Sequence, residues 1–73
     1  MNRIPKQGWH RDHTAAARMR AFLGRYTETQ AVKWFGLSRM TIARAAAGMP
    51  LQAATLCVVL DGLRRSDEAA EHE

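Results

Sequence analysis

Apolar residues near the start of the chain recur every three or four positions, the spacing that places them on one side of an α-helix. Arg18, Arg20 and Arg25 fall on the opposite side, where water would cover them. Asp12 and Thr14 are both preferred residue types for the cap that precedes such a helix. The pattern therefore predicts a helix over residues 13–25, with an apolar stripe made of Met19, Phe22, Leu23 and Tyr26.

Residues 27–38 carry the signals that start, end and restart a helix. Thr27 and Gln30 have the spacing of a capping box, in which each side chain bonds a backbone N–H at the helix start. Gly36 sits where a left-handed residue commonly ends a helix, and Ser38 is a preferred cap for the next one. The chain should therefore form a short helix from Glu28, a tight turn, and a second short helix.

The second short helix is expected to have one buried face and one outer face free of acidic residues. The buried face comprises Ile42, Ala45, Ala46 and Met49, at helical spacing. The outer face comprises Arg39, Met40, Ala43, Arg44 and Ala47. Such a slim helix suits the DNA major groove, where an arginine matches guanine O6 and N7 and an apolar group touches the thymine methyl.

These residues resemble the helix-turn-helix of phage repressors and Cro proteins. The matching positions are Val32, four residues before the turn glycine, and then Gly36, Leu37 and Ile42. The resemblance covers roughly residues 14–65 and implies an all-α, compact bundle of four or five helices containing a helix-turn-helix. The family generally has alanine in place of Val32, so the larger side chain here could shift the crossing of the two helices.

The last apolar segment, residues 51–65, follows Pro50, which suits the first turn of a helix. Cys57 is interpreted as a small buried residue, yet together with Val58 it makes the middle of the segment apolar nearly all round. A helix apolar on every side needs burial on every side, which so small a domain cannot supply. The second face, expected to form a homodimer interface, comprises Cys57, Val58 and Asp61. The first face comprises Ala53, Leu56, Leu60 and Leu63, with Val59 beside them.

A second interpretation of this segment stays open. Residues 56–60, followed by Asp61 and Gly62, also fit a strand and a hairpin turn. Trp34 has two interpretations as well: it lies at the edge of the core, or it contacts a partner, since exposed aromatic residues are enriched at interfaces.

Charge divides the chain into a basic body and an acidic end. Residues 1–60 hold nine Lys or Arg against Asp12 and Glu28, a net +7, whereas residues 61–73 hold two Arg against five acids, a net −3. We expect a basic N-terminal arm over 1–12, a helix-turn-helix domain over 13–66 and an acidic tail over 67–73. The arm would touch a minor groove or phosphates, or fray with Trp9 folded over the core.

Composition favours a binding protein over an enzyme. The 73 residues offer no Ser/His/Asp or Cys/His set, no paired acids on one helix face and no phosphate-cradling glycine loop. His10 and His13 lack the further ligands that zinc needs, so neither a metal nor a cofactor is expected. No apolar run approaches the ~20 residues of a membrane span, which predicts no membrane and a cytoplasmic location.

The resemblance and the basic charge together predict a sequence-specific regulator of transcription that binds double-stranded DNA. A homodimer would repress by occupying an inverted repeat with half-sites about 34 Å apart; activation through contact with RNA polymerase is the other direction of control. Expected base contacts are Arg39, Met40, Ala43 and Arg44. Expected phosphate contacts are Thr29, Gln30, Lys33, Ser38 and Thr41.

Two other functions fit parts of the pattern. One is the DNA-binding piece of a recombinase or transposase, which would need a catalytic domain that these residues do not contain. The other is a protein-interaction module that uses Trp34 and the last helix and has lost DNA binding. Salt-dependent binding to duplex DNA separates the second from the regulator, because phosphate contacts weaken as salt rises.

Overall fold

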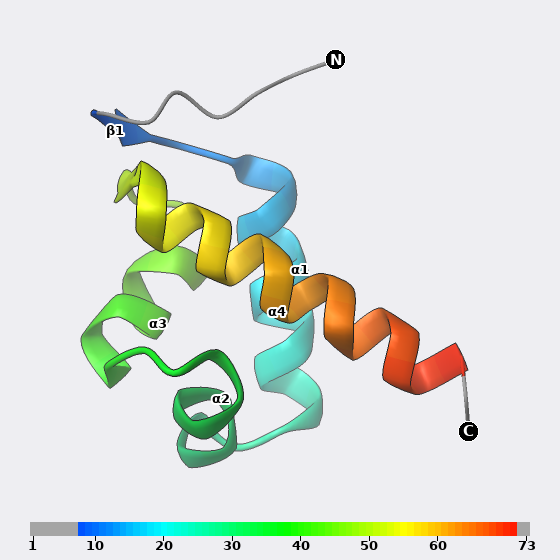
Figure 1. Cartoon of the computed structure of the whole chain (residues 1–73). Coiled ribbons are helices and arrows are strands. Elements are labelled where there is room, and N and C mark those ends of the chain that lie inside the picture. The colour runs from blue at the N-terminus through cyan, green and yellow to red at the C-terminus, as the bar shows by residue number, and fades with distance from the viewer. Residues whose placement is uncertain (1–7, 72–73) are drawn as a thin grey trace.

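The computed structural model describes residues 8–71 of the chain. Within this range the chain forms four helices and a pair of two-residue strands (Figure 1). The all-α class is confirmed. In Figure 1, α4 crosses α1, and α2 and α3 lie to one side of both. In chain order the elements are β1 (Trp9–His10), α1 (His13–Arg25), α2 (Glu28–Phe35), α3 (Arg39–Ala46), β2 (Leu51–Gln52) and α4 (Ala53–Glu71).

The start of α1 is set by Asp12, which decides between the two expected caps. Its Oδ1 accepts the backbone N–H of Ala15 at 2.9 Å, satisfying one of the unpaired donors of the first turn. Met19 and Phe22 are buried as expected, and Tyr26 lies just beyond the helix end with its ring centroid 4.6 Å from that of Phe22. The predicted helix over 13–25 is confirmed at both ends.

The capping box that begins α2 is also confirmed. Gln30 N–H donates to Thr27 Oγ1 at 3.1 Å, and Thr27 N–H donates to Gln30 Oε1 at 2.8 Å. Gly36 ends the helix in the left-handed conformation, with φ of +68°. Ala31 is fully buried and Val32 half-buried against the core, so the valine is accommodated where α2 packs on its neighbours.

The end of α3 falls earlier than the sequence pattern indicates. Gly48 N–H donates to the Ala45 carbonyl at 3.2 Å and Met49 N–H to the Arg44 carbonyl at 3.0 Å, while Gly48 has φ of +76°. These two bonds around a left-handed glycine form a Schellman motif, which closes the helix. The chain therefore turns away before Met49, which is 49% exposed, and its predicted place on the buried face is wrong.

The segment before α4 forms a strand and not a helical turn. Leu51 and Gln52 pair antiparallel with His10 and Trp9, so the helix begins at Ala53 and the expected start at Pro50 is wrong. The same pairing holds residues 9–10 of the expected arm against the body of the protein. Residues 1–7 lie outside the described residues, as do residues 72–73 of the expected tail.

Helix α4 is continuous through residues 56–60, where the sequence left a strand open, and past residue 66, where the acidic tail was expected to begin. Residues 56–60 are helical, so the strand interpretation is wrong, and the helix crosses residue 66 and continues to Glu71. Asp67, assigned to the expected tail, accepts a hydrogen bond from Arg18 on α1. Arg64 and Glu68 form an i,i+4 ion pair at 2.6 Å along the same stretch. Residues 67–71 are therefore an extension of the folded helix.

One face of α4 closes the core, and the opposite face is open to solvent. Leu56, Val59 and Leu63 are buried against α1, α2 and α3. Cys57 is exposed, which contradicts its interpretation as a buried residue. The cause is the position of the helix: only one of its sides meets the other three helices, and Cys57 lies on the other side together with Val58.

Close approach between α2 and α4 depends on Gly62. A Cβ atom at this position would overlap the ring of Phe35, which is buried on α2. Next to this contact, Trp34 Nε1 donates to the Gly62 carbonyl at 2.9 Å, and the Arg65 guanidinium lies 5.0 Å from the Trp34 ring centroid. Trp34 therefore lies at the core edge, as the first of its two interpretations predicts, and it fixes α2 against α4.

Candidate nucleic-acid interface

Helix α3 is held at the surface from its ends and from behind. At its start, Thr41 N–H donates to Ser38 Oγ at 3.2 Å. At its end, Arg20 Nη1 of α1 donates to the Ala46 carbonyl at 2.7 Å, satisfying one of the free carbonyls of the last turn. Ile42 is 1% exposed and anchors the helix in the core. These contacts fix the direction in which the outer face points.

The predicted outer face of α3 is exposed along its whole length. Arg39, Met40, Ala43, Arg44 and Ala47 all face solvent, and the Met40 side chain is 64% exposed. No acidic residue occurs in the helix. The other three residues of this face, Met40, Ala43 and Ala47, are apolar or small. The helix therefore presents a narrow ridge to solvent.

The two arginines differ in their intramolecular contacts. Arg39 turns towards the start of α2: its Nε lies 3.6 Å from Glu28 Oε1, and its Nη2 donates to Thr29 Oγ1 at 3.2 Å. Its side chain nevertheless remains 67% exposed. Within residues 8–71, the Arg44 guanidinium has no hydrogen-bond or ion-pair partner. Glu28 and Thr29 therefore orient Arg39 without covering it, and Arg44 is free to meet a ligand.

The candidate phosphate contacts lie around the starts of α2 and α3. Ser38 and Thr41 share a hydrogen bond between their hydroxyl oxygens at 3.0 Å, and Thr29 accepts from Arg39. Gln30 uses its Oε1 in the capping box, which leaves its amide N–H groups to donate outward. Lys33 is exposed on α2, one helical turn beyond this group, and borders a cleft on the side of α4. Gln30 lines the same cleft, so the structure places Gln30 and Lys33 together on α2 and Ser38 and Thr41 together at the start of α3.

Acidic side chains are engaged elsewhere in the fold. Arg64 donates to Asp61 Oδ1 at 2.6 Å, and Arg65 donates to Asp61 Oδ2 at 3.1 Å. The bond from Arg64 holds the pKa of the Asp61 carboxyl below its ordinary value, and the same bond raises the pKa of Arg64. By contrast, residues 28–46 hold three cations against Glu28, a net of +2. Residues 13–25 of α1 add Arg18, Arg20 and Arg25 without an acid, so the positive charge extends over α1, α2 and α3.

The face of α4 predicted to form a dimer is open to solvent. Cys57, Val58 and Asp61 are all exposed, and Ala54 continues the same stripe one turn earlier. Val58 is 39% exposed. Ala54, Cys57 and Val58 therefore form an exposed stripe of small and apolar side chains. Asp61 lies at its border, already paired with Arg64 and Arg65.

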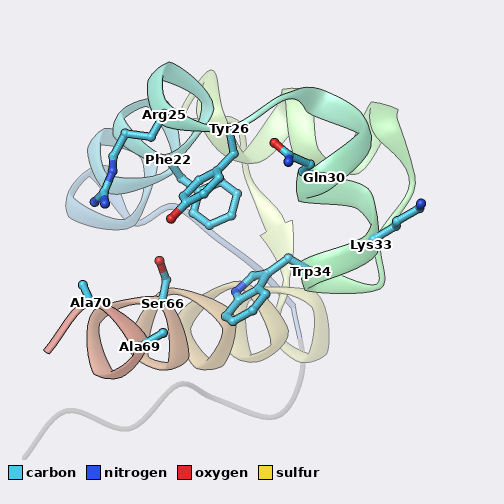
Figure 2. Close-up of a pocket in the computed structure, with 9 residues that line it drawn as sticks. All are labelled: Phe22, Arg25, Tyr26, Gln30, Lys33, Trp34, Ser66, Ala69 and Ala70. Carbon is cyan, nitrogen blue, oxygen red and sulfur yellow. The ribbon is translucent and has the colours of Figure 1, made fainter. Parts of the chain in front are cut away.

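Sequence reasoning missed a cleft between α1, α2 and α4. Phe22, Tyr26 and Trp34 line it, and Figure 2 shows them with their rings turned towards the C-terminal half of α4. Phe22 and Tyr26 lie at the end of α1 and Trp34 lies on α2, and residues 66–70 of α4 complete the wall. No local spacing signals such a cleft, because it exists only where the ends of α1 and α2 diverge from a helix that the sequence pattern ended at residue 66.

Two further properties concern the described part of the chain. None of the helices within residues 8–71 combines the length and the apolar character needed to cross a bilayer. The same residues bring no three His, Cys, Asp or Glu side chains into a group able to hold a metal ion.

Comparison with known proteins yields no family model, no curated protein and no solved structure that matches this chain. The similarity of residues 27–48 to phage repressors therefore remains a prediction from the residues. The features of the protein that bear on its function are the α3 surface, the charge around it and the exposed face of α4.

Proposed function

We propose that this protein is a sequence-specific regulator of transcription that places the outer face of α3 in the major groove of double-stranded DNA. The observation that carries the proposal is an exposed helix face with two arginines and no acid, fixed at both ends by Ser38 and Arg20. An ordinary solvated helix would carry acids and lysines in i,i+4 pairs. A surface that lacks them and bears forked donors suits base edges and phosphates.

The contacts divide by chemistry. Arg44, which has no partner among residues 8–71, and Arg39, oriented by Glu28, would donate to guanine O6 and N7. Met40 and Ala43 would meet thymine methyl groups. The phosphate contacts would come from Thr29, Gln30, Lys33, Ser38 and Thr41. Phosphate contacts set register and affinity, whereas base contacts set sequence preference.

Regulation would follow from occupancy. Two subunits joined through the Cys57, Val58 and Asp61 face of α4 would bind an inverted repeat with half-sites about 34 Å apart. A dimer on a promoter excludes RNA polymerase, so repression is the proposed outcome, in the cytoplasm where such DNA lies. No catalytic step is part of the proposal.

The test is a titration of duplex DNA with the full chain at 50 and 200 mM salt. The two Lys33 side chains of a dimer are the cationic phosphate contacts, so counterion release predicts about a 10-fold loss of affinity between these concentrations. An affinity that does not change with salt, or no binding to DNA at either concentration, would contradict the proposal and favour a protein-interaction module.

Glu28→Gln tests whether Arg39 is held in position. Removing the carboxylate charge releases the guanidinium, so the affinity ratio of cognate to random DNA should fall by up to about fivefold, the worth of an exposed ion pair. Affinity for random DNA should hold or rise, because a negative charge near the phosphates is lost. Thr29→Val removes the second contact and should act in the same direction. An unchanged ratio in both variants would show that Arg39 needs no positioning.

Val58→Glu tests the dimer face. In a dimer of the Val58→Glu variant, the introduced glutamate and Asp61 of each subunit would bring four carboxylates together at the interface, where they would repel one another. We therefore expect monomers in sedimentation equilibrium at concentrations where the wild type is dimeric. Ala70→Glu, on an exposed turn of α4 remote from this stripe, is the matched control and should remain dimeric. A dimer that survives Val58→Glu would place the interface on another surface.

A further inference from the structure

A cleft of about 490 Å³ opens where the C-terminal end of α1 and the side of α2 face the second half of α4 (Figure 2). This volume lies in the range of small-molecule sites. Phe22 and Tyr26 at the end of α1 and Trp34 on α2 supply aromatic walls. On α4 the facing residues are Ala69 and Ala70, whose short side chains leave the space open.

The walls are fixed without any occupant. The Phe22 ring packs against Tyr26 at 4.6 Å and against Phe35 at 5.1 Å between centroids. The Trp34 indole is held by its hydrogen bond to the Gly62 carbonyl and by the Arg65 guanidinium on its ring. A ligand would therefore meet preorganised aromatic surfaces and would not have to order them, which is a saving in binding free energy.

The polar side chains at the cleft are neutral or cationic. Tyr26 and Ser66 direct hydroxyl groups into the space between α1 and α4 in Figure 2. The charged residues that border it, Arg25 and Lys33, are both cationic, and within residues 8–71 no acidic residue lines it. Figure 2 shows their charged ends turned outward, so they form the rim of the cleft and not its floor.

We propose that this cleft binds a small aromatic anion. Its ring system lies between Tyr26 and Trp34, and its polar edge meets the hydroxyls of Tyr26 and Ser66. Its negative group remains at the rim, where Arg25 at one end and Lys33 at the other supply positive charge. Aromatic walls select a flat apolar body, since stacked and edge-to-face ring pairs are favourable. Arg25 and Lys33 at the rim would repel a positively charged molecule of the same shape.

Binding of a ligand in the cleft also affects binding of DNA, and this step rests on the proposed function. Lys33 belongs both to the rim of the cleft and to the proposed phosphate contacts. An anion held beside Lys33 competes with DNA phosphate for the same ammonium group and adds repulsion. Binding of the two ligands is therefore mutually weakening, and the coupling is equal in both directions. The aromatic anion acts as an inducer.

The first test uses 8-anilinonaphthalene-1-sulfonate and its uncharged analogue N-phenyl-1-naphthylamine, without DNA. Trp9→Phe removes the other tryptophan, so fluorescence then reports Trp34 alone. We expect saturable 1:1 quenching of Trp34 by the sulfonate, and on the order of tenfold weaker binding of the neutral analogue, the worth of two exposed charge contacts. Equal affinity for the two probes, or probe binding without Trp34 quenching, overturns the proposal.

Two variants locate the site on the folded protein. Ala69→Phe fills the cleft and should weaken binding of the sulfonate at least tenfold, whereas Ala17→Phe, exposed on α1 away from the cleft, should leave it unchanged. Arg25→Gln and Lys33→Gln should each weaken the sulfonate about threefold to fivefold without affecting the neutral analogue. If Ala17→Phe weakened both probes and Ala69→Phe weakened neither, the site would lie elsewhere and the assignment would be overturned.

The second test repeats the duplex titration in the presence of saturating sulfonate. Weaker DNA binding, lost again in Ala69→Phe, supports the inducer step. Unchanged DNA affinity with the cleft occupied overturns that step but leaves the binding site as established by quenching. If the chain does not bind DNA at all, the proposed function fails, and the first test still decides the cleft.

Discussion

Replacing Gly62 with alanine is expected to lower the free energy of unfolding by about 1–3 kcal/mol, the range for an overpacked core. In a helix alanine is normally better than glycine by about 1 kcal/mol, so intrinsic preference alone predicts the opposite sign. The added Cβ would overlap the Phe35 ring, and that ring is buried and packed edge-on against Phe22. Phe35 has little room to move, so α4 would have to lift from α2.

Gly24→Ala is the matched control for this prediction. Gly24 also lies within a helix, but a Cβ at this position would meet no atom within 4 Å. Only the helix preference remains, and stability should rise by about 0.5–1 kcal/mol. Urea unfolding followed by circular dichroism measures both variants. If Gly62→Ala were as stable as Gly24→Ala, the close contact of α2 with α4 would be contradicted.

Arg44→Ala is expected to cost about 1–3 kcal/mol of binding free energy on the preferred DNA sequence, because a bidentate contact to a base would be lost. Stability should not change, since the Arg44 side chain has no internal partner within residues 8–71 and alanine is a good helix former. The variant therefore separates recognition from folding more cleanly than a change at Arg39, which contacts α2.

Lys33→Ala provides the comparison for Arg44→Ala. A phosphate contact carries no sequence information, so Lys33→Ala should weaken cognate and random duplexes by the same factor. Arg44→Ala should instead relax the preference at one base position of each half-site. Binding competition against a set of single-base variants measures both effects. An unaltered preference in Arg44→Ala would remove this residue from the base contacts.

Features that depend on neighbours in the chain were predicted well from the sequence. The capping box at Thr27, the left-handed turn at Gly36 and the serine cap at Ser38 involve hydrogen bonds between residues three or four apart. The inner and outer faces of α3 follow from the helical period once those caps are known. The candidate surface could therefore be outlined from residues 27–48 alone.

Features that depend on distant segments were predicted poorly. Cys57 was placed in the interior by its apolar neighbours, but which side of α4 meets the core is decided by α1, α2 and α3. Met49 fitted the helical period, yet the Schellman motif at Gly48 ends the helix first. The pairing of Trp9 and His10 with Gln52 and Leu51 has no local signal in either segment.

The contacts of Arg39 and the aromatic cleft also could not be predicted from residues that are close together in the sequence. Glu28 and Arg39 are eleven residues apart and lie on different helices, so only the turn at Gly36 brings them together. The cleft needs a helical α4 beyond residue 66, where the sequence shows acids and small residues but no apolar stripe. Helix ends in such segments are set by long-range pairs such as Arg18 with Asp67.

Methylation interference on a duplex selected from random sequences is the most direct test of α3 as the element that enters DNA. Guanine N7 faces the major groove, and a methyl group there blocks an arginine contact. We expect N7 methylation to abolish binding at guanines in two symmetric half-sites about one helical turn apart, and Arg44→Ala to remove one position of interference in each. Binding that is insensitive to N7 methylation, or interference confined to adenine N3 in the minor groove, would contradict the account.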